Sequence, residues 1–236
     1  FAQTLQGKKK SVVYPSWKET AKIKYKFKAG TDGTRKAAFR KAALIWLQTA
    51  CVELQEVSSG EQVNVGNYNS KSCHVNGLGY IPGYKNTVNL GWCKNFGHLG
   101  SLIHEIGHLV GWDHTQKRPD AQAKIMGPDG KWHGPYLKVH WNRITTSSWK
   151  HQYQPNRNAY FGSSARRWVN YDYGSVMHYG TGGSHCKGGA CMDQIIKGKK
   201  TAKVGNRKGF SGQDILKAND QYRCSTKSFF IEGSSS

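Results

Sequence analysis

The chain has 236 residues, 37% of them hydrophobic and 21% charged, so it is long enough to fold around one sizeable core. No apolar run approaches the roughly 18 residues of a membrane-spanning helix, and no transmembrane segment is expected. The net charge of +21 comes from lysines and arginines spread along the whole chain without a recognised nucleic-acid-binding motif, which argues against a specific nucleic-acid partner.

The N-terminal half predicts regular structure. Residues 1–16 are expected to form an extended basic arm, and residues 21–27 alternate polar and apolar side chains, as in a half-buried strand. Residues 31–34 offer helix caps before an amphipathic helix that ends near residue 51, and residues 51–57 predict a second strand. The apolar face of that helix comprises Phe39, Ala42, Ala43, Trp46 and Leu47.

The rest of the chain is more irregular. Short strands broken by Gly, Asn and Pro are expected over residues 60–92, and a second helix over 98–111. After residue 111 the sequence is rich in glycine until a last helix over 211–222, with Ser211 as its N-cap. Residues 225–236 are polar and predict a flexible C-terminal tail.

Six cysteines lie at positions 51, 73, 93, 186, 191 and 224, with no CxxC pair typical of a structural zinc site. An even number in this arrangement favours three disulfides and therefore a secreted, extracellular protein. Spacing alone leaves fifteen pairings open.

The segment from His104 reads HEIGHLVGWDH and carries the strongest functional signal. Histidines four apart on a helix project from one face, so His104 and His108 can reach a single ion. Gly111 lets the chain leave the helix sharply, and His114 can then supply a third ligand. Glu105 lies beside these histidines without binding the ion itself.

This pattern predicts a site for one catalytic Zn²⁺ ion. Three neutral imidazoles leave zinc its full charge and an open position, where the pKa of a bound water falls to about 7. Glu105 is expected to act as general base on that water, which attacks a peptide carbonyl. The predicted function is therefore that of a zinc endopeptidase acting on proteins or peptides.

HExxHxxGxxH with a later methionine turn resembles the metzincin metalloproteases. Residues 171–179 read YDYGSVMHY, which is similar to the Ser-x-Met-His-Tyr turn of the astacin family. The resemblance implies that Met177 lies beneath the zinc site. It also implies that Tyr179 is an additional zinc ligand that swings to stabilise the oxyanion during the reaction.

The resemblance further implies an α+β fold with a catalytic domain over residues 17–224. Its upper lobe, about 17–111, would hold a twisted, mostly parallel β-sheet and two long helices. Its lower lobe, about 112–224, would be mostly irregular with a C-terminal helix.

The same resemblance assigns the disulfides and a substrate-binding strand. The implied pairs are Cys51–Cys224, Cys73–Cys93 and Cys186–Cys191. The segment His74, Val75 and Asn76 would be an exposed edge strand that pairs with an extended substrate through backbone hydrogen bonds.

One departure from the family pattern concerns activation. Astacins usually place Glu directly after the third zinc histidine, where it engages the buried new N-terminus, but this chain has Thr115. Burial of the N-terminus is therefore not carried over, and trimming at the basic cluster 8–10 is the alternative.

The basic charge leaves two interpretations open. Many astacins favour an acidic residue after the scissile bond, and five basic residues lie in the region expected to border that pocket: Lys197, Lys199, Lys200, Lys203 and Arg207. The alternative function is a non-catalytic basic protein that attaches to polyanionic matrix or surfaces. The presence of Glu105 favours the enzyme, since a degenerate enzyme commonly loses its base.

Overall fold

The computed structural model describes residues 21–156, 159, 162–163, 167–195 and 204–222. The basic arm 1–16 and the tail 225–236 lie outside these residues, and the boundaries of the arm, the lobes and the tail stay predictions. Among the described residues, no helix is both long and apolar enough to cross a membrane.

The strands, in chain order, are β1 (Ala21–Phe27), β2 (Val52–Glu56), β3 (Val63–Gly66), β4 (His74–Asn76), β5 (Asn86–Asn89), β6 (Ile125–Met126), β7 (Trp132–His133), β8 (Leu137–Val139), β9 (Gly162–Ser163), β10 (Arg167–Trp168) and β11 (Met192–Gln194). The α-helices are α1 (Gly33–Ala50), α2 (Leu99–Leu109), α3 (Pro119–Gln122), α4 (Ser147–His151) and α5 (Gly212–Tyr222). Single 3₁₀ turns are η1 (Phe96–His98), η2 (Thr115–Lys117) and η3 (Trp141–Arg143).

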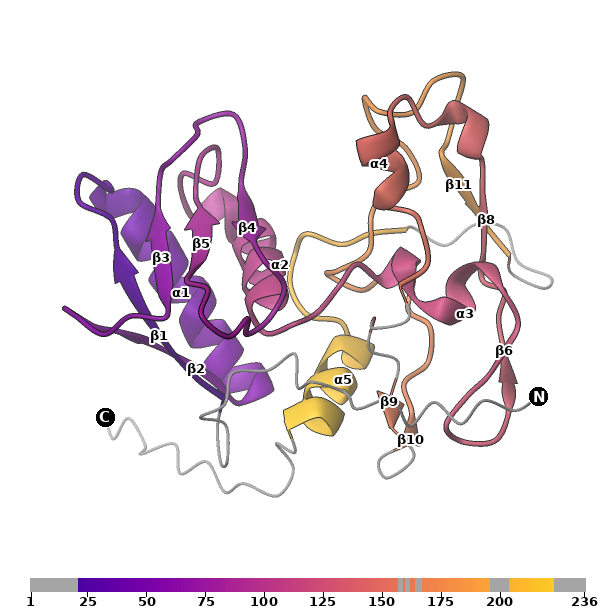
Figure 1. Ribbon diagram of the computed structural model, residues 1–236, viewed down its shortest axis with the longest axis horizontal. Helices are drawn as coiled ribbons and strands as arrows, with labels where there is room; N and C mark the ends of the chain where they lie inside the picture. The colour runs from indigo at the N-terminus through magenta and orange to yellow at the C-terminus, as the bar shows by residue number, and fades with distance from the viewer. Residues whose placement is uncertain (1–20, 157–158, 160–161, 164–166, 196–203, 223–236) are drawn as a thin grey trace, which may run out of the picture.

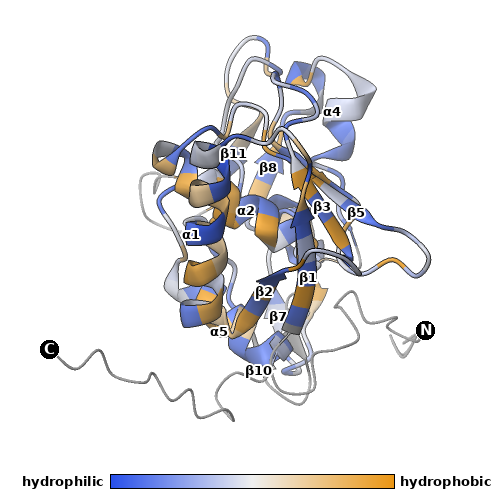
Figure 2. Cartoon of the chain, turned by 90° about the vertical axis from the view of Figure 1, so that its left-hand side faces the viewer, coloured by the Kyte–Doolittle hydropathy of each residue, from blue (hydrophilic) through white to orange (hydrophobic). Residues whose placement is uncertain are grey.

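A five-stranded sheet in the order β2-β1-β3-β5-β4 forms the left half of the molecule in Figure 1. The strands β2, β1, β3 and β5 run parallel to their neighbours, and β4 pairs antiparallel with β5 at one edge. Helices α1 and α2 lie on the same side of this sheet (Figure 2). The prediction of a mostly parallel sheet with two helices is confirmed.

The alternation along β1 explains how the sheet presents two different faces. Ile23 and Tyr25 are buried in the core, whereas Lys22, Lys24 and Lys26 are exposed. Successive side chains of a strand point to opposite faces, so the apolar set faces the helices and the lysines face solvent. The strand predicted at residues 21–27 therefore has the expected bounds.

Local signals set the ends of α1 and hold it against α2. The Asp32 side chain accepts a hydrogen bond from the Arg35 amide at 3.0 Å and caps the N-terminus, within the range expected to do so. The helix ends at Cys51, which has a left-handed backbone with φ of 48°. The Trp46 indole donates to the Ile103 carbonyl of α2 at 3.0 Å, so the two helices are joined by a buried hydrogen bond.

Helix α5 packs against α1. As predicted, Ser211 caps it, because the Ser211 hydroxyl accepts from the Asp214 amide at 3.0 Å. Ala218 and Tyr222 of α5 belong to the same hydrophobic core as α1, α2 and the sheet, and the Tyr222 hydroxyl donates to the Val110 carbonyl at 2.5 Å. The C-terminal end of α5 is thus tied to the segment that follows α2.

A second, smaller core lies in the right half of Figure 1, around the antiparallel pair β8 and β11. Its buried members are Ala121, Leu137, Ile144, Tyr153, Tyr171, Cys191 and Met192. The disulfide Cys186–Cys191 lies beside this core, and Cys73–Cys93 lies in the first half. Both pairings are confirmed, whereas Cys224, the expected partner of Cys51, lies outside the described residues.

Candidate zinc site

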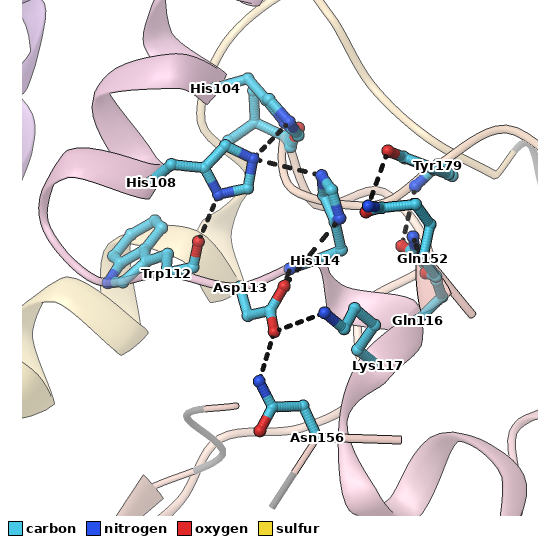
Figure 3. Close-up of polar contacts among 11 residues, drawn as sticks. His104, His108, Trp112, Asp113, His114, Gln116, Lys117, Gln152, Asn156 and Tyr179 are labelled. Carbon is cyan, nitrogen blue, oxygen red and sulfur yellow. Dashed lines mark hydrogen bonds and ion pairs between the residues drawn. The ribbon is translucent and has the colours of Figure 1, made fainter. Parts of the chain in front are cut away.

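Three histidine side chains converge near the C-terminal end of α2. His104 and His108 lie one turn apart on the helix, and Gly111, with φ of 90°, turns the chain so that His114 faces them. The Nε2 atoms of His104 and His108 are 3.1 Å apart, and those of His108 and His114 are 3.2 Å apart (Figure 3). The structure therefore brings the three predicted ligands together.

This arrangement fits a zinc ion. Zn–N bonds of 2.0–2.1 Å in a tetrahedral site place two nitrogens about 3.3 Å apart, close to the distances between these Nε2 atoms. Burial lowers the pKa of His104 and His114 and brings the pKa of His108 to about 4. The imidazoles are therefore neutral at pH 7 and offer lone pairs to a cation.

Backbone carbonyls orient two of the three rings. His104 Nδ1 donates to the Val176 carbonyl and His108 Nδ1 to the Trp112 carbonyl, each at 2.8 Å. These bonds fix the hydrogen on Nδ1 and leave Nε2 free for a metal. His114 differs, because its buried Nδ1 has no hydrogen-bond partner among the described residues.

Glu105 follows the first histidine and is 8% exposed. Burial raises the pKa of its carboxyl to about 8, although the nearby positive charge of Arg207 lowers it. Helix α2 also packs against the edge strand β4. The carboxyl group therefore lies in the interior near Arg207 and the substrate-binding strand expected at His74, Val75 and Asn76.

The predicted methionine turn, within residues 171–179, packs against α2. Met177 is fully buried, and its carbonyl accepts from the Thr115 amide at 3.1 Å. A Cβ atom added at Gly107 would lie 2.5 Å from Met177 Sδ, closer than real Cβ contacts come. Gly107 therefore allows the turn to approach the helix between its two histidines.

Tyr179 lies beside the third histidine. The ring centroids of Tyr179 and His114 are 4.3 Å apart, and the Tyr179 hydroxyl points toward Gln152 Oε1 at 3.5 Å (Figure 3). Burial raises the pKa of Tyr179, so its hydroxyl stays protonated at neutral pH.

Two residues that support the site were not assigned this role from the sequence. Asp214 of α5 accepts from the Ser175 hydroxyl at 2.6 Å and from the Val176 amide at 2.8 Å. Arg207 Nη1 donates to the carbonyl of Val176 at 2.7 Å, the same carbonyl that orients His104. Their distance from the histidines along the chain leaves no local pattern that could have identified these contacts.

Thr115, which follows the third histidine, joins this network. Its hydroxyl donates to the Ser175 hydroxyl at 3.0 Å, and Ser175 in turn donates to Asp214. The basic cluster 8–10, the alternative site of N-terminal trimming, lies outside the described residues.

Comparisons with known proteins agree with this geometry. The model of the astacin peptidase family matches residues 9–223. The protein SpAN of Strongylocentrotus purpuratus is 28% identical over 92% of this chain and 33% of its own length. The zinc metalloproteinase nas-13 of Caenorhabditis elegans is 27% identical over 90% of this chain and 42% of its own length. The chain thus spans only about a third to two thirds of the first curated relatives that it matches.

Solved structures share the fold. The high choriolytic enzyme 1, a hatching enzyme zinc-protease of Oryzias latipes, superposes with a TM-score of 0.68 at 20% identity and covers 87% of this chain and 90% of its own. Myroilysin gives a TM-score of 0.57 at 20% identity over 90% of this chain and 96% of its own. Since the family model matches residues 9–223, which is most of the chain, the chain belongs to the astacin family of zinc peptidases.

Proposed function

We propose that this protein is a secreted zinc endopeptidase in which His104, His108 and His114 hold the metal and Glu105 is the general base. The observation that carries the proposal is the convergence of three histidine Nε2 atoms, each within 3.2 Å of a neighbouring one, with the buried carboxyl of Glu105 on the same helix as two of them. The two disulfides among the described residues support an extracellular location, because disulfides persist in oxidising compartments.

Zinc held by these histidines would supply a Lewis acid that polarises a peptide carbonyl and lowers the pKa of water. Glu105 takes a proton from the attacking water and delivers it to the leaving amine. The pKa of about 8 that burial gives Glu105 falls when a cation is added nearby, into the range where a carboxylate accepts a proton at neutral pH. No other described acidic residue occurs in the zinc-binding helix.

The remaining parts of the proposed site place the substrate. The protonated Tyr179 hydroxyl can donate to the oxyanion that forms as the peptide carbonyl is attacked, and Tyr179 is also proposed as a metal ligand. Met177 forms the hydrophobic base of the site. The outer edge of β4, at His74, Val75 and Asn76, pairs with no other strand of the described residues and can pair with an extended peptide as a sixth strand.

Arg207 supports a preference for acidic residues next to the scissile bond. Its Nη1 donates to the carbonyls of Val176, Asn206 and His178, and its Nε and Nη2 make no hydrogen bond to the described residues. That free edge of the guanidinium suits a substrate carboxylate, which binds arginine through two parallel hydrogen bonds. The four lysines considered with it, Lys197, Lys199, Lys200 and Lys203, lie outside the described residues.

A peptide library tests the enzymatic proposal. The protein, Glu105→Gln and the control Glu61→Gln are incubated with the library, with and without a zinc chelator, and cleavage is read by mass spectrometry. We expect cleavage that is lost on chelation and in Glu105→Gln but kept in Glu61→Gln, whose carboxyl pairs with Lys85 far from α2. Zinc-loaded, fully processed protein that cleaves nothing would overturn the proposal.

A second candidate function, attachment to a polyanion, is supported by a row of lysines on the outer face of the sheet. Lys22, Lys24, Lys26 and Lys28 are all exposed, about 6.6 Å apart along β1 and its extension. A row of cations about 20 Å long suits a linear chain of anionic groups. Binding of this kind can coexist with peptidase activity.

The lysine row is tested on an immobilised sulfated polysaccharide. In one variant the four lysines of the row are replaced by glutamine. In the control variant, which loses the same charge, four exposed lysines elsewhere are replaced by glutamine: Lys124, Lys138, Lys150 and Lys208. We expect the first variant to elute at clearly lower salt than the second, because its cations contact the polymer directly. Equal elution would mean that only the overall charge matters.

A further inference from the structure

The Nδ1 atoms of the three histidines have different surroundings. His104 and His108 each donate from Nδ1 to a backbone carbonyl at 2.8 Å. The Nδ1 atom of His114 is buried and has no hydrogen-bond partner among the described residues. A neutral imidazole that binds a metal through Nε2 carries its hydrogen on Nδ1, so this atom is a buried donor that requires an acceptor.

The Asp113 carboxylate lies next to this atom. Asp113 Oδ1 is 3.9 Å from His114 Nδ1 and accepts from the His114 amide at 2.8 Å. Its other oxygen, Oδ2, accepts from Asn156 Nδ2 at 2.6 Å and pairs with Lys117 Nζ at 3.0 Å. Figure 3 shows the carboxylate held between His114 on one side and Lys117 and Asn156 on the other.

We propose that Asp113 is the positioning residue for the third zinc ligand. In the zinc-loaded protein its carboxylate accepts the Nδ1 hydrogen of His114, either by closing the present 3.9 Å separation or through one shared water. It thereby holds the ring with Nε2 toward the other two histidines and adds a negative charge near a dicationic metal. This inference rests on the proposed zinc site and deepens it. A partner of this kind is worth about 10- to 100-fold in metal affinity.

A purely structural role for Asp113 makes a different prediction. In that case the carboxylate would serve only to hold Lys117 and Asn156. Removing the Lys117 ammonium would then weaken zinc binding as much as removing the Asp113 charge. Lys117→Met removes this ion pair but leaves the Asp113 carboxylate beside His114. The two roles therefore predict different zinc affinities for this variant.

Zinc affinity, measured by competition with a chromophoric chelator, is compared in wild type and three variants. Asp113→Asn keeps an oxygen for the His114 amide but loses the charge. Lys117→Met removes only the ion pair. Asp129→Asn is the matched control, because Asp129 contacts His133 at 2.9 Å on an exposed turn. We expect the Kd for zinc to rise about tenfold or more in Asp113→Asn and to stay within about threefold in the other two.

Two results would overturn the inference: an unchanged zinc Kd in Asp113→Asn, or an equal loss in Lys117→Met. If wild type binds no zinc, the proposed function itself fails, which separates the two proposals. Should Asp113→Asn not fold, a crystal structure of the zinc-loaded wild type decides. An Asp113 oxygen that accepts from Nδ1, directly or through one shared water, supports the role, and any other acceptor there refutes it.

Discussion

Replacing Gly100 by alanine should destabilise the protein although alanine is the better helix former. Gly100 is the second residue of α2, and its position packs against the backbone of Arg207. A Cβ atom there would clash with the Arg207 carbonyl group and lie 2.8 Å from its Cα. The main chain at Arg207 must therefore move, because a backbone carbonyl cannot rotate away as a side chain can.

The size of the effect follows from two opposing contributions. Alanine in place of glycine favours a helix by about 1 kcal/mol. Overpacking costs about 1–3 kcal/mol, and moving Arg207 weakens, without breaking, its hydrogen bonds to the Val176 and His178 carbonyls, which costs about 1 kcal/mol more. The packing cost exceeds the helical gain, and we expect a net loss of about 1–3 kcal/mol.

Gly33→Ala is the matched control. Gly33 is the first residue of α1, and a Cβ atom there meets nothing within 4 Å. Thermal unfolding of both variants is measured by circular dichroism, with and without zinc. We expect Gly100→Ala to lower Tm by about 2–10 °C and Gly33→Ala to leave Tm unchanged or slightly higher. A Gly100→Ala protein as stable as Gly33→Ala would refute this account of the packing.

Two further predictions concern charged side chains. Arg207→Gln should reduce the excess of acidic residues after the cut in a peptide-library digest, and an unchanged ratio of acidic to neutral sites would contradict the role of the guanidinium. Lys217 is buried 4.4 Å from the centre of the Trp112 ring, and burial lowers its pKa to about 7. Because an unfolded lysine has a pKa of about 10.4, the unfolded chain binds more protons between pH 7 and 10, so this group makes the stability rise with pH. Lys217→Met should remove that slope and raise the free energy of unfolding more at pH 7 than at pH 10, whereas parallel pH curves would contradict it.

The parts of the fold that the sequence predicted are those set by local patterns. The alternation of residues 21–27 and the apolar face of residues 35–50 each reflect which side of one element is buried. The histidine spacing was equally informative, because two positions four apart on a helix must share a face. Met177 and Tyr179 could be placed only through the family resemblance, since their contacts to α2 and His114 are tertiary.

The two residues missed by sequence analysis, Arg207 and Asp214, have in common that they reach the candidate site through the backbone of Val176. Its carbonyl accepts from His104 and from Arg207, and its amide donates to Asp214. The backbone of one residue therefore links α2, the predicted methionine turn and α5, which are separated by up to 110 residues in the chain. The orientation of His104 thus depends on charged side chains about 100 residues later in the chain, Arg207 and Asp214. The motif by itself places two imidazoles on one helical face but does not fix which nitrogen each offers to a metal. The histidine motif therefore requires the rest of the fold.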